Sequence, residues 1–331
     1  METSDAIKIN DQLQVLTEYD KQMIQKYQPQ IKDGTLIIGR DQDLYSLDFI
    51  RTLNIYSLQL ERCYNIIPKL ESKTIKQFKT EYCNIENITD FQFENLEVLE
   101  LCNYYQKETE TLAKQILQFQ KLKVLILFRW IIDISPLSQM TELTNLFLNG
   151  CKVRGIDLLQ PIVSLQELYI DYTDIDITPI QYWTKLTKLS LISCNLINLD
   201  ALTPLVNLQE LNLIGNKIVH LQPILKLNLS KLDARYNNIQ ADNFEHPNFD
   251  LREQKQPTEA ELKTANMLRN IDTPINSLRN QCKIKLNYRA KISLFKIKIT
   301  ECLQQQSDSH SKLIARAAFL FEQINAIESC Q

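Results

Sequence analysis

The chain has 331 residues, of which 44% are hydrophobic and 23% are charged, and its formal net charge at pH 7 is -3. The apolar fraction is ample for a continuous core, and so small a net charge predicts neither an acidic nor a basic partner for the chain as a whole. No window of 18 apolar residues occurs in the sequence, so we expect no membrane insertion.

The start of the chain is charged at Asp5, Lys8 and Asp11, before any long apolar run, and therefore predicts no secretory signal. The eight cysteines include no Cys-x-x-Cys pair, which favours reduced thiols. Both features predict a cytoplasmic protein, with the nucleus as the alternative address.

Residues 1–32 are predicted to form a helical cap. Five apolar or aromatic residues in this segment recur at the spacing of one helical face, which suits a helix that covers the first unit of a larger core. These residues are Leu13, Leu16, Tyr19, Met23 and Tyr27.

Residues 33–250 are predicted to form about ten repeats. The clearest repeat reads Leu208-x-x-Leu211-x-Leu213-x-x-Asn216-x-Ile218. A fixed period of this kind means stacked units, each of which buries its apolar face only against a neighbour. The frame returns every 21 or 22 residues in its regular part, and the repeats begin at Asp33, Ile55, Ile75, Leu96, Leu122, Leu143, Leu165, Leu186, Leu208 and Leu229.

Within each repeat the fourth and sixth positions alternate with a period of two, which predicts a short strand with those side chains pointing inward. Prolines such as Pro136, Pro161 and Pro179 then mark a compact outer turn or single-turn helix. The one expanded repeat, which starts at Leu96, is predicted to contain a longer outer helix over 109–119. Matching segments 43 residues apart, 133–144 with 176–187 and 159–168 with 202–211, indicate a duplicated pair of repeats.

These residues resemble the leucine-rich-repeat family in its short class of 21 to 22 residues, as in a phosphatase regulatory subunit and in internalins. The resemblance implies an α/β fold, a curved solenoid with a parallel concave sheet, short helical or 3-10 convex turns, a helical N-terminal cap and a helical C-terminal extension. In the family the ninth position is usually Asn, whose amide bonds to the backbone of adjacent turns. Here that position holds Asn216 and Asn237, then Cys63, Cys83, Cys151 and Cys194 as small buried substitutes, and Thr173, Tyr104 and Trp130 as further departures.

Residues 251–331 are predicted to form a C-terminal cap and a basic helical tail. Residues 248–251 resemble a terminal strand, and 257–261 open a helix with a capping box. The tail is read either as a solvated helical hairpin or as a patch for an acidic partner. Its basic residues are Arg279, Lys283, Lys285, Arg289, Lys291, Lys296 and Lys298.

Catalytic motifs are not evident in the sequence. Two glycine-bounded segments, 34–39 and 150–155, imitate a phosphate loop but lack the lysine and hydroxyl that follow it. The histidines His220, His246 and His310 lie in separate units. We therefore expect no enzyme, no catalytic residues, no metal, no cofactor and no small-molecule substrate.

The outward strand positions are free of packing and are the better place to look for function. Exposed aromatic and aliphatic side chains across adjacent strands, rimmed by charge, are typical of protein-binding surfaces. We therefore expect a non-catalytic interaction module or scaffold that holds a protein ligand. The alternative is a regulatory or ribonucleoprotein adaptor that acts through the basic C-terminal helices, and nucleic acid is the less favoured partner. The predicted contact residues are Ile126, Phe128, Arg129, Phe147, Tyr169, Asp171, Tyr172, Lys188, Ile192, Arg235 and Tyr236.

Overall fold

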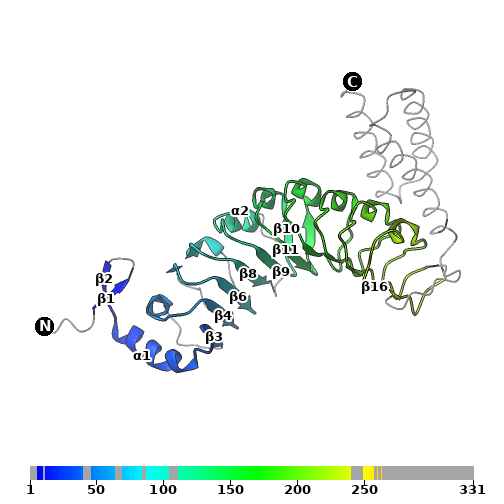
Figure 1. Ribbon diagram of the computed structural model, residues 1–331. Coiled ribbons are helices and arrows are strands. Elements are labelled where there is room, and N and C mark those ends of the chain that lie inside the picture. The colour runs from blue at the N-terminus through cyan, green and yellow to red at the C-terminus, as the bar shows by residue number, and fades with distance from the viewer. Residues whose placement is uncertain are drawn as a thin grey trace, which may run out of the picture.

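A parallel sheet of eleven strands forms one side of the molecule, as a computed structural model shows (Figure 1). The structure describes residues 6–9, 12–39, 46–63, 69–83, 87–103, 111–239, 249–256, 259 and 262. Neighbouring strands of the sheet come from successive repeats, so the order of the strands in the sheet follows their order in the chain. In sequence order the strands are β3 (Thr35–Gly39), β4 (Ser57–Glu61), β6 (Gln77–Glu81), β8 (Val98–Cys102), β9 (Val124–Phe128), β11 (Asn145–Asn149), β13 (Glu167–Tyr169), β14 (Lys188–Ser190), β15 (Glu210–Asn212), β16 (Lys231–Asp233) and β17 (Phe249–Asp250).

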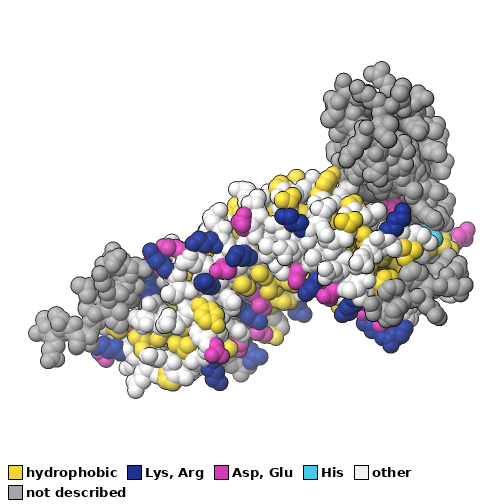
Figure 2. Space-filling model, viewed as in Figure 1, with side chains coloured by type: hydrophobic (Ala, Val, Ile, Leu, Met, Phe, Trp, Pro, Cys, Tyr) yellow, Lys and Arg dark blue, Asp and Glu magenta, His cyan; other side chains and the backbone are white. Residues whose placement is uncertain are grey.

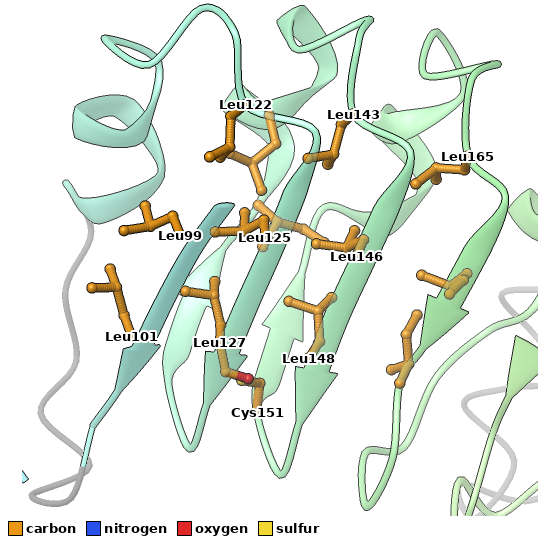
Figure 3. Packing of buried hydrophobic residues seen from close by; sticks show 14 of the residues in the cluster. Leu99, Leu101, Leu122, Leu125, Leu127, Leu143, Leu146, Leu148, Cys151 and Leu165 are labelled. Atoms are coloured by element: carbon orange, nitrogen blue, oxygen red, sulfur yellow. The ribbon is translucent and has the colours of Figure 1, made fainter. Parts of the chain in front are cut away.

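The core is a set of leucine columns that run behind the sheet. Leu125 and Leu127 of β9 point inward, beside Leu146 and Leu148 of β11, and all four are fully buried (Figure 3). Burying one such side chain contributes on the order of 1.5 to 3 kcal/mol, which is realised only when the next repeat covers it. The predicted inward positions are therefore confirmed.

Short helices cover the opposite side of the stack (Figure 1). Prolines occupy the first turn of η5, η7 and η9, where no ladder donor is needed, as expected from the sequence. Pro161 differs, because it follows η6 instead of opening it. The outer helices are η3 (Asp48–Thr52), η4 (Ile88–Asp90), α2 (Leu112–Ile116), η5 (Ser135–Gln139), η6 (Ile156–Leu159), η7 (Thr178–Tyr182), η8 (Asp200–Leu202) and η9 (Gln222–Ile224), with two small parallel pairs beside them, β5 (Leu70–Ser72) with β7 (Phe91–Phe93) and β10 (Ile131–Asp133) with β12 (Lys152–Arg154).

The expanded repeat contains an α-helix, α2, as predicted, although it is only five residues long. Its apolar side buries Leu112 and Ile116, and Phe119 follows it into the core. Because strands stack about 4.8 Å apart while the outer turns need more room, the sheet lies on the concave side of the stack. We call its outward surface the concave face.

In the repeats whose ninth position the structure describes, the side chain there bonds to backbone groups of neighbouring repeats. The Asn216 carboxamide oxygen accepts from the Cys194 and Leu196 amides, both at 3.0 Å, and its nitrogen donates to the carbonyls of Leu191 at 2.7 Å and Leu213 at 2.8 Å. The four ladder cysteines take the same buried place, as predicted. Each donates its thiol to a carbonyl of the preceding repeat, as Cys63 to Ile38, Cys83 to Leu60, Cys151 to Leu127 and Cys194 to Ile170.

Other residues at the ninth position also donate a hydrogen bond to a backbone carbonyl of a preceding repeat. The indole nitrogen of Trp130 donates to the Leu101 carbonyl at 3.0 Å, and the Thr173 hydroxyl donates to the Cys151 carbonyl. The Trp130 side chain is buried and packs in the core beside the expanded repeat. Tyr104 lies outside the described residues.

The N-terminal cap is partly helical, which corrects the prediction of one helical face that began at Leu13. Strands β1 (Ala6–Ile9) and β2 (Gln12–Val15) form an antiparallel hairpin, and helix α1 (Glu18–Tyr27) starts only after this hairpin. The reason is local, since the side chains of Thr17 and Asp20 form a reciprocal capping box that begins the helix there. Beyond it, Met23 and Tyr27 are buried as predicted, and Tyr27 stacks on Phe49 at 5.6 Å.

At the other end, β17 pairs in parallel with β16, which confirms a terminal strand within the predicted segment 248–251. The predicted capping box at 257–261 and the basic tail from Arg279 to Lys298 lie outside the described residues, apart from Glu259 in the former. The structure therefore tests the repeats and the start of the C-terminal cap.

Candidate functional site

The side chains at the fifth position of the repeats form one continuous row across the concave face, because all neighbouring strands pair in register. Ile126 lies opposite Phe147, and Phe147 lies opposite Tyr169. On either side the row becomes polar, with Glu100 before it and Ser190 after it. Three consecutive strands thus carry the only apolar stretch that this row has between β4 and β16.

The third and seventh positions widen this stretch into a surface patch. Phe147 and Tyr169 stack with ring centroids 4.6 Å apart and planes 25° apart, a geometry that contributes beyond simple burial. Each side chain of the patch is partly exposed, so the surface is apolar and accessible together. The apolar patch, as we name it, consists of Val98, Cys102, Val124, Ile126, Phe128, Phe147 and Tyr169.

Three patch residues, Val98, Cys102 and Val124, were not among the predicted contact residues. Val98 and Cys102 lie on β8, with Val98 opposite Val124 and Cys102 opposite Phe128. Strand β8 belongs to the expanded repeat, whose extra residues interrupt the regular spacing after this strand. The third and seventh positions counted from Leu96 identify Val98 and Cys102.

Charged residues beside the patch are paired with one another. On the N-terminal side, Lys79 bonds to Glu100 at 3.0 Å. On the C-terminal side, Lys188 lies 3.2 Å from Glu167 and 4.0 Å from Glu210. Lys and Arg side chains lie beside Asp and Glu side chains over much of the visible surface (Figure 2). The rim of the patch therefore projects little net field.

The ionisation of these groups follows from the pairing. The Glu167 hydrogen bond raises the pKa of Lys188, which therefore stays charged near neutral pH. Partial burial raises the pKa of the Tyr169 phenol and that of the Cys102 thiol, because desolvation disfavours their anions. The patch thus presents a neutral phenol and a neutral thiol among apolar groups.

Asp171 has a structural position instead of an exposed one. It is 8% exposed, and one carboxylate oxygen accepts from the Ser190 hydroxyl at 2.8 Å and from the Ile192 amide at 3.0 Å. This carboxylate ties β13 to the end of β14. Its bonds hold Ile192, which is half-buried, at the edge of the patch.

Arg129 and Tyr172 occupy the eighth position, where the chain leaves the strand in a left-handed conformation, with φ of 60° and 59°. Gly150, with φ of 64°, fills the same position between them. A residue with a Cβ costs roughly 1 to 2 kcal/mol in this conformation. Tyr172 is 68% exposed, so little packing offsets that cost and its ring lies at the edge of the concave face.

Arg235 and Tyr236 lie apart from the other predicted residues. Their repeat is three strands beyond Tyr169, which at the usual strand spacing is about 14 Å. Arg235 pairs with Asp233 at 2.9 Å and with Asp250 at 3.4 Å. The structure thus brings together the predicted residues from Ile126 to Ile192 but places Arg235 and Tyr236 in a separate charged cluster.

Other kinds of site find no support in the described residues. Among them, no group of three or more His, Cys, Asp and Glu side chains is placed to hold a metal ion. In the same part of the chain, no helix has the length and apolar character needed to cross a membrane.

Comparisons with known proteins concern the fold alone. No protein-family model matches the chain, and no curated protein matches it. Among solved structures, internalin C2 of Listeria monocytogenes is similar, with 22% identity over 59% of this chain and 78% of that one and a TM-score of 0.39. Internalin F of the same organism shares 17% identity over 68% and 71%, with a TM-score of 0.47, and the leucine-rich-repeat protein LIC12759 of Leptospira interrogans shares 19% over 62% and 73%, with a TM-score of 0.42. The fold itself is a leucine-rich-repeat solenoid, since its own repeated strand, outer turn and buried leucine frame define it.

Proposed function

We propose that this chain is a non-catalytic interaction module that binds a protein partner on its apolar patch. The observation that carries the proposal is the aligned row Ile126, Phe147 and Tyr169, in which half-buried apolar groups of three strands form one surface. Aromatic residues are enriched at the energetic centres of protein interfaces, and Phe and Tyr supply a large contact area with few rotatable bonds.

The chemistry of the patch favours a partner that inserts apolar side chains. The charges at its rim, on Lys79, Glu100, Glu167 and Lys188, already have partners within the sheet, so a ligand gains little by adding its own charges. Binding driven by apolar contact depends weakly on salt, whereas binding steered by unpaired charges falls as salt screens them. We therefore expect the affinity to change by less than about threefold between about 50 and 500 mM salt.

Affinity capture from the cells in which the protein is native tests the proposal. Bait protein with Phe128→Ala, Phe147→Ala and Tyr169→Ala is compared with the unchanged chain. Each ring is only half-buried, so the triple variant should keep its fold, which circular dichroism and the urea midpoint can verify. The matched control is Leu158→Ala with Val163→Ala, because both side chains are exposed, apolar and on the outer turns.

The expected result is a partner that the control retains and the triple variant loses. A partner that survives all three patch substitutions would place binding elsewhere. Capture of RNA or of an acidic protein, lost steeply as salt rises, would instead support the adaptor that acts through the basic tail.

A further inference from the structure

Two of the ladder cysteines, Cys63 and Cys83, occupy the ninth positions of adjacent repeats. Strands β4 and β6 pair with Glu61 opposite Glu81, two residues before Cys63 and Cys83, and the Arg62 amide continues this ladder to the Glu81 carbonyl at 2.8 Å. Neighbouring strands lie about 4.8 Å apart. A disulfide spans Cα atoms separated by about 4.4 to 6.8 Å, a range that includes the usual spacing of neighbouring strands.

The Cys83 sulfur also contacts Cys63. The Cys63 amide donates to the Cys83 sulfur at 3.4 Å, and hydrogen bonding to Cys63 lowers the pKa of Cys83 against the opposing effect of burial. A thiolate is the nucleophile in thiol–disulfide exchange, so Cys83 is the thiol favoured to react first. Both residues retain slight exposure, 7% for Cys63 and 6% for Cys83.

The other two ladder cysteines have no cysteine at the ninth position of a neighbouring repeat. Cys151 and Cys194 are fully buried, and the Thr173 rung lies between them. Burial raises the pKa of Cys151 to about 11, which keeps it protonated and unreactive at neutral pH. Cys151 and Cys194 therefore serve as matched controls for the reactivity of Cys63 and Cys83.

We propose that Cys63 and Cys83 form a reversible disulfide that cross-links two neighbouring repeats when the protein meets a low-molecular-weight disulfide such as oxidised glutathione. The Cys83 thiolate attacks one sulfur of the oxidant and releases one glutathione thiolate. The Cys63 thiol then loses its proton and attacks the Cys83 sulfur of the mixed disulfide, which releases the second glutathione. Two protein thiols are thus oxidised, one oxidant disulfide is reduced to two thiols, and the two protons pass to the products.

The cross-link joins residues 20 positions apart, across the interface between two stacked units. Repeat proteins are held together by such interfaces between neighbours, and a covalent bond across one opposes its opening. The oxidised protein should therefore show a higher thermal midpoint and slower amide exchange in β4 and β6 than the reduced protein.

The test uses the full chain, folded, in buffers with a fixed ratio of oxidised to reduced glutathione. After denaturation and alkylation of the remaining thiols, the oxidised chain should carry two fewer alkyl groups than the reduced chain treated in the same way, because a disulfide has no thiolate to alkylate. A digest without reductant should yield one peptide pair joined through Cys63 and Cys83, which dithiothreitol separates. Cys83→Ser should abolish the pair, whereas Cys194→Ser should leave it intact.

The unchanged chain alone can overturn the proposal, so a variant that fails to fold does not obscure the outcome. No linked pair in the folded protein would overturn it, and so would a pair that forms only in urea or one that includes Cys151 as readily as Cys63. A stable mixed disulfide at Cys83 with no cross-link would also overturn it, because the second attack would then be geometrically blocked.

Discussion

Replacing Asn216 tests how the ladder side chains hold neighbouring repeats together. Its carboxamide serves four buried backbone groups, the amides of Cys194 and Leu196 and the carbonyls of Leu191 and Leu213. Leaving a buried polar group without a partner costs about 1 to 3 kcal/mol. With two amides orphaned and the Leu213 carbonyl still bonded to the Asn237 side chain, we expect Asn216→Ala to lower the free energy of unfolding by roughly 3 to 5 kcal/mol.

Asn216→Cys provides the informative comparison. Elsewhere in the ladder a thiol accepts one amide and donates to one carbonyl, as Cys151 does with Trp130 at 3.4 Å and Leu127 at 3.3 Å. A thiol at position 216 should therefore recover roughly half of the loss, leaving a cost of about 1 to 3 kcal/mol. Urea unfolding of both variants with an unchanged m-value measures this. Equal losses for Ala and Cys, or a loss below about 1 kcal/mol for Ala, would refute the assigned role.

Two further predictions concern glycine and pH. Gly155→Ala should destabilise the protein more than Gly150→Ala. Both glycines have positive φ, but a Cβ at position 155 would lie 2.9 Å from the Ser135 backbone nitrogen, whereas a Cβ at position 150 would make only ordinary contacts. Equal urea midpoints of the two variants would contradict this prediction. The Arg252 guanidinium lowers the pKa of Asp250 to about 2, below the value of about 3.9 in an unfolded chain. The stability that Asp250 contributes is therefore complete above the unfolded pKa and is lost as pH falls towards 2. Asp250→Asn should therefore reduce the fall of the urea midpoint in acid. The same dependence of the midpoint on pH in the variant and the unchanged chain would argue against this role of Asp250.

The repeat frame could be predicted because burial at the fourth and sixth positions is a local, periodic requirement. Leu211 and Leu213 point into the core, as do the residues at the same positions of the other repeats, so the positions found in one regular repeat could be transferred to the rest. The N-terminal hairpin could not be separated from a helix in this way. The spacing of Leu13, Leu16 and Tyr19 fits a helical face, while the pairing of β1 with β2 depends on contacts between two segments.

The surface was predictable in part for the same reason. Outward strand positions follow from the frame, which identified Phe147 and Tyr169 as neighbours before their stacking was seen. What the frame does not contain is the partner of each polar group. Asp171 is drawn inward by bonds to the next strand, and Arg235 is separated from the patch by the number of intervening repeats.

The affinity of the captured partner for single-site variants tests the central claim most directly. Isothermal titration with Phe147→Ala should show at least about a tenfold weaker affinity, because truncating a central aromatic anchor typically costs more than about 1.4 kcal/mol. Val206→Ala removes an exposed apolar side chain near η8 and should leave the affinity within about twofold. An affinity unchanged by Phe147→Ala, in a variant with an unchanged urea midpoint, would contradict the assignment of the apolar patch as the binding surface.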